Sequence, residues 1–323
     1  MISILCGLKK IIVNNDLVIG DDLNIIKNPL EIEEIRDENL FNTVGSNYYG
    51  SLVESPVLLQ RILCREDEID PYKVIQNFRG YFQHFLMSIW FVKDNSISLS
   101  DVMFINENKE VMYFDRNPLL FSNSKGEYKS VYLTSDETKE ALKWLELLAP
   151  LVIRGISSEK KEDSSVGTRL NNNNKNFDYY NFNRLQRALR FVALARSESF
   201  PPAKITFYIS ALECLFSNSK TEVRMQVADR TTRVLSDVFE ERTRINKIIS
   251  IAYEFRSSYI HGSVNNQKTI KKALKPYETI EELSFELDDI LRKVLKRFLT
   301  DLNHVVHMDG AAFSVWISQL LYK

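Results

Sequence analysis

The chain has 323 residues, 44% hydrophobic and 26% charged, a composition typical of a globular protein with one large or two ordinary domains. Its formal net charge of −1 excludes binding to nucleic acid through a bulk positive field, so any RNA contact must come from a local basic patch. Apolar runs are too short for a membrane span, and the three cysteines are odd in number and lack metal-ligand spacing. We therefore expect a cytoplasmic protein without membrane contact.

The first half of the chain predicts a mixed α+β domain over residues 1–154. A helix is expected where Val74, Phe78, Phe82, Phe85 and Ile89 share one face. Thr134 and Glu137 form a capping box, which predicts a second helix that stops at Pro150. Short apolar runs between turn-forming residues predict strands at 11–13, 17–19, 23–26, 102–105, 111–114 and 131–133.

No motif assigns a task to this first half. It carries no phosphate loop, no dinucleotide fingerprint and no metal-ligand cluster. Residues 155–176 follow as a run of serine, asparagine and charged residues that has too little apolar surface to offset its ordering entropy. This segment predicts a polar linker or a long exposed loop.

Residues 177–323 predict an all-α domain. Pro201 and Pro202 suit the first turn of a helix, and Thr279 marks the beginning of another. Successive amphipathic stripes joined by short polar turns are typical of a helical bundle. The stripes span residues 182–192, 205–216, 223–238, 245–260, 283–302 and 313–320.

The candidate site lies at the end of the helix that contains residues 245–260. Arg256 falls in the middle of its apolar stripe, and a guanidinium that cannot lose its charge needs an anionic partner there, such as a nucleic-acid phosphate. His261 follows five residues later with an ordinary pKa near neutrality, and Gly262 is suited to ending the helix. A helix cap made by Arg256 and His261 is the alternative without chemistry.

The sequence Arg256-Ser257-Ser258-Tyr259-Ile260-His261-Gly262, which follows the helical run 211–216, resembles the Arg-x4-His motif of HEPN ribonucleases, and in particular their ApeA-like branch. The resemblance covers about residues 177–307. It implies a HEPN-like helical bundle and a metal-independent endoribonuclease without a cofactor. In that reaction the RNA 2′-hydroxyl attacks the adjacent phosphorus and leaves a 2′,3′-cyclic phosphate. His261 would transfer protons, Arg256 would orient the phosphate, and Ser257 would support the site.

Glu213 and Arg230 are two further candidates. Glu213 lies on the margin of the stripe 205–216 and Arg230 lies within the stripe 223–238, so the two are placed where they can pair. The resemblance implies that they support the active site. The residues taken alone favour a structural ion pair that locks two helices together.

The resemblance also implies partners. Two proton transfers need two groups, and one chain supplies one histidine to the motif, which implies a homodimer acting on an RNA substrate. ApeA-like proteins act in anti-phage defence by abortive infection, so the protein is expected to be a toxin-like effector. Residues 1–154 would then be a sensor or regulatory domain for a phage-derived trigger. The alternative is a catalytically silent HEPN module that serves as a dimerisation or RNA-binding scaffold.

Overall fold

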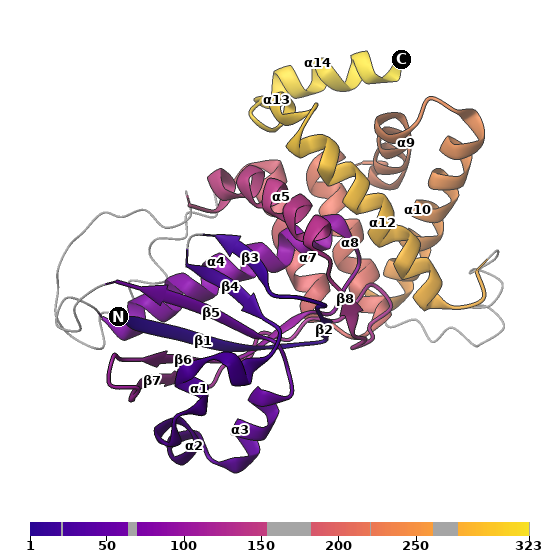
Figure 1. The fold of residues 1–323 in the computed structure, drawn as a ribbon. Coiled ribbons are helices and arrows are strands. Elements are labelled where there is room, and N and C mark those ends of the chain that lie inside the picture. Colours follow the sequence, from indigo (N-terminus) through magenta and orange to yellow (C-terminus); the bar gives the residue numbers. More distant parts are fainter. Residues whose placement is uncertain (21, 64–69, 154–181, 220, 261–276, 323) are drawn as a thin grey trace. The chain divides into compact units, whose positions relative to one another are not determined.

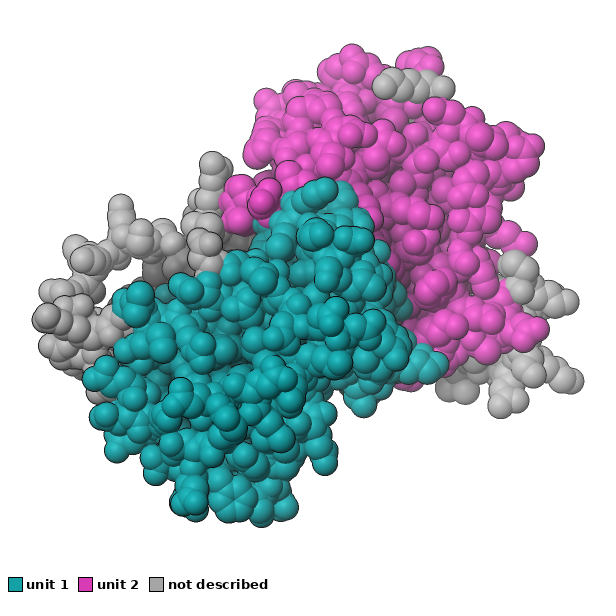
Figure 2. All heavy atoms as spheres, in the orientation of Figure 1, with its two compact units in different colours: residues 1–123, 127–145 teal, residues 124–126, 146–323 magenta. Residues whose placement is uncertain are grey.

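The computed structural model describes residues 1–323 except 21, 64–69, 154–181, 220, 261–276 and 323 (Figure 1). The chain divides into two compact units, one of residues 1–123 and 127–145 and the other of residues 124–126 and 146–323 (Figure 2). The first unit contains an antiparallel sheet and the second is mostly helical. These features confirm the predicted α+β class. The predicted linker at 155–176 lies outside the described residues.

A six-stranded sheet is the centre of the first unit. Its strand order is β3-β4-β5-β1-β6-β7, and every neighbouring pair is antiparallel. A separate short ribbon pairs β2 with β8 in parallel. The strands are β1 (Ile2–Lys9), β2 (Ile11–Ile12), β3 (Leu17–Gly20), β4 (Leu23–Ile26), β5 (Val57–Ile62), β6 (Ser98–Ile105), β7 (Val111–Asp115) and β8 (Val131–Tyr132).

Successive side chains of the central strand β1 point to opposite faces of the sheet and so belong to two different hydrophobic cores. Ile4 and Cys6 join the core under α4 (Pro71–Val92), whose aromatic stripe is buried as predicted. Leu5 points to the opposite core. That core is covered by η1 (Pro29–Glu31), α1 (Glu33–Arg36), α2 (Glu38–Val44) and α3 (Ser46–Val53). The sequence did not predict these helices, because helices of four to eight residues are too short to show a helical period.

The helix α5 (Ser135–Ile153) begins as predicted but continues further. Thr134 and Glu137 form the capping box: Glu137 N donates to Thr134 Oγ1 at 3.2 Å, and Thr134 N donates to Glu137 Oε2 at 3.0 Å. Pro150 lies inside the helix, so the predicted stop at this residue was wrong. A proline removes one backbone hydrogen bond from a helix. In α5 the helical backbone nevertheless continues for three residues beyond Pro150, to Ile153.

The second unit is built from helices that match the predicted stripes. They are α7 (Arg184–Ser197), α8 (Pro201–Phe216), α9 (Val223–Leu235), α10 (Phe239–Ile260), α12 (Ile280–Leu299), α13 (Asn303–Val306) and α14 (Gly310–Leu321). The helix α8 packs against α7, α10 and α12. It buries Ile205, Ile209 and Leu212 completely, so it is the central helix of this unit. Among the described helices, none has the length and apolarity that crossing a bilayer requires.

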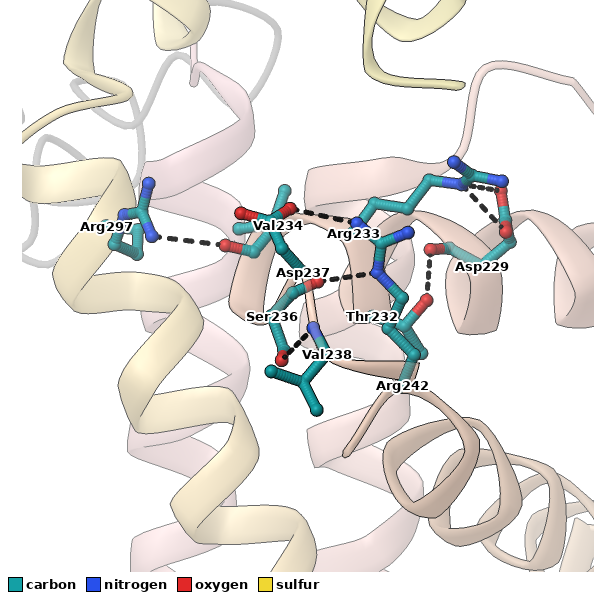
Figure 3. A network of polar contacts seen from close by, with 9 residues as sticks. All are labelled: Asp229, Thr232, Arg233, Val234, Ser236, Asp237, Val238, Arg242 and Arg297. Carbon is teal, nitrogen blue, oxygen red and sulfur yellow. Dashed lines mark hydrogen bonds and ion pairs between the residues drawn. The ribbon is translucent and has the colours of Figure 1, made fainter. Parts of the chain in front are cut away.

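The junction between α9 and α10 is held by arginines (Figure 3). Arg242 Nε donates to Ser236 O at 2.6 Å, and Val238 N donates to Ser236 Oγ at 3.0 Å. From α12, Arg297 Nη1 donates to Val234 O at 3.2 Å. These bonds satisfy carbonyls at the end of α9 and fix the direction in which α10 leaves the turn. Val238 itself is exposed between the helices, so the predicted stripe ends earlier, at Leu235.

Candidate functional site

A carboxylate on α8 and two donors on α10 form the core of the candidate site. Glu213 Oε1 accepts hydrogen bonds from Arg256 Nη1 at 2.5 Å and from Tyr253 Oη at 2.9 Å. The side chains of Arg256 and Glu213 are 25% and 22% exposed, so the ion pair is partly shielded from water. Tyr253 and Arg256 are three residues apart on one helix, which places both on the same side of α10.

The local sequence explains why these groups meet. On α8, Leu212 and Leu215 are fully buried, and Glu213 lies between them at the margin of the packed face. On α10, Ile249 and Ala252 are buried, and Arg256 continues their stripe one turn later. The two helices pack against each other, which brings the margin of one onto the stripe of the other. The carboxylate is the anionic partner that the position of Arg256 requires.

Tyr253 acts only as a donor in this arrangement. Burial, together with the neighbouring Glu213 carboxylate, raises the pKa of Tyr253 far above its usual range. The phenol therefore keeps its proton at physiological pH and can donate to Glu213 throughout. Two donors on one carboxylate oxygen hold both side chains of the ion pair in one orientation.

Arg256 retains donors that Glu213 does not use. The guanidinium carries five N–H groups in one plane, and Glu213 accepts from Nη1. Its Nε is buried and has no hydrogen-bond partner within the described part of the chain. The side chain is 25% exposed, so a second anion can reach only its exposed N–H groups and not Nε. Phosphate and carboxylate oxygens are the groups that match the geometry of a guanidinium.

The predicted pairing of Arg230 with Glu213 is wrong. It is 8% exposed, and its Nη1 donates to the carbonyl oxygen of Phe216 and to Gln226 Oε1, the latter at 3.0 Å. Phe216 is the last residue of α8, so Arg230 satisfies a carbonyl at the C-terminal end of that helix. Glu213 thus pairs with Arg256 and not with Arg230. Burial lowers the pKa of Arg230, yet an arginine stays charged at physiological pH.

The remaining motif residues fall at or beyond the end of α10. Ser257 is exposed on the last turns of the helix. His261 and Gly262 lie outside the described residues, so their predicted roles stay predictions. The structure therefore joins Glu213 to Arg256 and attaches Arg230 to the end of the helix that carries Glu213.

Three aromatic residues near Arg256 were not identified as site residues from the sequence. Tyr253 lies three residues before it, and Tyr259 lies three residues after it. Tyr259 was placed on the buried stripe, but it is 47% exposed and its ring centroid is 5.9 Å from that of Phe200, which is 52% exposed. The spacing of three residues between each tyrosine and Arg256 could have indicated that both tyrosines lie near its side chain. The contact with Phe200 joins residues about 60 positions apart and has no signature in the sequence.

Within the described ranges, no group of three or more His, Cys, Asp and Glu side chains is placed to hold a metal ion. The two described cysteines, Cys6 and Cys214, are free thiols. Burial raises the pKa of both, which makes each a poor nucleophile at neutral pH. No protein-family model matches the chain, and neither a curated protein nor a solved structure matches it.

Proposed function

We propose that the helical unit is a metal-independent endoribonuclease of the HEPN type that acts as a homodimer. The observation that supports this best is the partly exposed Arg256, which Glu213 and Tyr253 hold in place five residues before His261 in the sequence. A cation oriented in this way, with donors to spare, suits the binding of an RNA phosphate.

The proposed reaction assigns one task to each group. His261 takes the proton from the RNA 2′-hydroxyl or gives one to the leaving 5′-oxygen. Arg256 orients the phosphate and stabilises the negative charge that develops on its oxygens. Glu213 and Tyr253 position the guanidinium. The second proton-transfer group is His261 of a second copy, which is why the proposal includes a two-fold dimer.

The exposed aromatic pair supports RNA as the substrate. Tyr259, three residues after Arg256, and its ring neighbour Phe200 both present ring surface to solvent, and Ile260, next to Tyr259 in sequence, is 55% exposed. Unpaired bases stack on such rings, and this contact does not depend on the base sequence. In the cell, the enzyme would be a toxin-like effector of abortive infection, and the first unit would regulate it in response to a phage-derived trigger.

The test is cleavage of an end-labelled RNA of mixed sequence in the presence of EDTA. We expect the wild type to cut and to leave 2′,3′-cyclic phosphate ends, and an all-deoxy strand of the same sequence to stay intact. His261→Ala and Arg256→Ala should abolish cleavage. His307→Ala and Arg244→Ala are matched controls, because both residues are exposed and Arg244 lies on the same helix as Arg256. Cleavage that survives His261→Ala refutes the proposal.

One observation favours the second candidate, a catalytically silent scaffold. The charge of Arg256 is already paired with Glu213, as in an ion pair that serves only to hold two helices together. A scaffold of this kind would dimerise or bind RNA, with an affinity that falls steeply with salt, and would not cut it. Cleavage separates the two candidates: preparations that form dimers by light scattering or bind RNA in a salt-dependent way, and still do not cut it, favour the scaffold.

A further inference from the structure

The first unit contains a pocket of about 480 Å³ between the sheet and α4. It lies where β3, β4 and β5 face the N-terminal half of α4, the elements labelled in Figure 1. This volume is within the range of small-molecule sites, which is roughly 300–1,000 Å³. All residues that form it belong to one compact unit.

One wall of the pocket is formed by Gly20, the last residue of β3, which has no side chain to occupy the space. A Cβ atom added to Gly20 would stand 3.8 Å from Tyr81 Oη, in ordinary contact distance, so a larger residue would fill the space. Below the opening, Leu23 and Phe78 are each 4% exposed and form an apolar base.

Three uncharged polar side chains surround this base. Gln60 comes from β5, where it lies opposite Leu23 in the strand register. Asn77 and Tyr81 are four residues apart on one face of α4. Within the described residues, none of these three side chains has a hydrogen-bond partner, and none of the lining residues is charged. Burial raises the pKa of Tyr81, so its hydroxyl stays protonated and can donate.

The lining decides between classes of ligand. A charged ligand would lose water over an apolar base and meet no opposite charge, which is unfavourable. An aliphatic ligand would leave the two amides and the phenol without hydrogen bonds. A flat neutral ring with donors and acceptors on its edge satisfies both requirements, because each amide offers one group of each kind. The edges of nucleobases carry this pattern.

We propose that this pocket binds a neutral nucleoside, with the base lying on Leu23 and Phe78 and its polar edge bonded to Gln60, Asn77 and Tyr81. The aromatic rings of Phe78 and Tyr81 add surface that favours a flat ligand. This site does not depend on the ribonuclease proposal, because it lies in the other unit and uses none of the same residues.

Calorimetric titration of the full chain tests the proposal. The probes are adenosine, guanosine, cytidine and uridine, with ribose as the control that lacks a base. We expect at least one nucleoside to bind with one site per chain, and ribose not to bind. Asn77→Ala and Tyr81→Phe should each weaken binding about five- to tenfold, the effect of losing one hydrogen bond. Gln76→Ala is the matched control, since Gln76 is exposed on the same helix and does not line the pocket.

A pocket-filling variant gives an independent result. Gly20→Val places two methyl groups beside Tyr81 and should abolish binding, while circular dichroism and the melting temperature show that the fold is kept. If Gly20→Val does not fold, Asn77→Ala and Tyr81→Phe decide, because both residues are exposed. Absence of nucleoside binding at millimolar concentration, equal binding of ribose, or binding that these variants leave unchanged would each overturn the proposal.

Discussion

The ion pair between Glu213 and Arg256 permits a quantitative test of the candidate site. Glu213→Ala removes the acceptor of two hydrogen bonds and leaves a partly buried guanidinium without its partner. Arg256→Met removes the charge and keeps an unbranched side chain of similar length. The double variant completes a cycle that isolates the energy of the pair.

The expected coupling follows from the geometry. Two unit charges about 4 Å apart attract by about 4 kcal/mol at the effective dielectric constant near a protein surface. The side chains are 25% and 22% exposed, so loss of hydration offsets part of this attraction and water screens another part. We expect a coupling of about 1–2 kcal/mol, and about 2–3 kcal/mol for Glu213→Ala alone, because Tyr253 also loses its acceptor.

The assay combines urea unfolding, followed by circular dichroism, with hydrogen exchange of peptides from α8 and α10. Hydrogen exchange assigns the loss of stability to the helical unit, which is needed because a chain of two units need not unfold in one step. The matched control is Glu241→Ala with Arg244→Met, an exposed pair on α10 whose coupling should be about 0.5 kcal/mol or less. A coupling below about 0.3 kcal/mol for Glu213 and Arg256 would refute the reasoning.

Three further predictions concern a buried cysteine, a tight turn and a buried ion pair. Burial raises the pKa of Cys6 from its ordinary 9.0 to about 12, so the folded state keeps a proton that the unfolded state releases. The stability that the buried Cys6 thiol contributes is present below pH 9 and is lost as the pH rises towards 12, about 1.4 kcal/mol by pH 10; between pH 8 and pH 10, urea unfolding should show a loss in the wild type that exceeds the loss in Cys6→Ala by about this amount, since Cys214 and Tyr253 have raised pKa values in both proteins. Gly126 has φ +82°, and a Cβ there would overlap the carbonyl oxygen of Ser199, so Gly126→Ala should cost about 2 kcal/mol or more, and an unchanged melting temperature would contradict the geometry. Asp288 and Arg292 form an ion pair on α12 with side chains 1% and 10% exposed; Asp288→Ala should cost about 3 kcal/mol in urea unfolding, and adding Arg292→Met should restore part of it.

The long helices could be predicted from the sequence, and the short elements could not. The aromatic residues of α4 recur with a helical period, which predicts that helix directly. The proline pair at the first turn of α8 predicts where that helix begins. Strand β1 is buried on both faces, so its sequence lacks the alternation of apolar and polar residues by which a half-exposed strand is predicted. Helices α1 to α3 are too short to be stable alone and are stabilised by packing on the sheet. Such tertiary contacts cannot be predicted from the local sequence.

The same limit applies to the site. Helical periodicity predicts that Arg256 shares a face with Ile249 and Ala252, and both of these are buried. The predicted continuation of the stripe beyond Arg256 is wrong, because Tyr259 and Ile260 are exposed. The partner of Glu213 does not follow, because it depends on how α9 and α10 are rotated against α8. Periodicity gives the face of each helix and leaves that rotation open. Arg230 and Arg256 both lie among apolar residues in sequence, and only the packing decides that one caps a helix end while the other meets the carboxylate.

The central place of β1 has a consequence for synthesis of the chain. Its two neighbours in the sheet are β5, which ends at Ile62, and β6, which ends at Ile105. Strand β1 therefore stays without its second partner until the roughly one hundred residues that lead to the end of β6 have also been translated. Contacts so distant along the chain form slowly, and an apolar strand that waits for them is a natural target for chaperones.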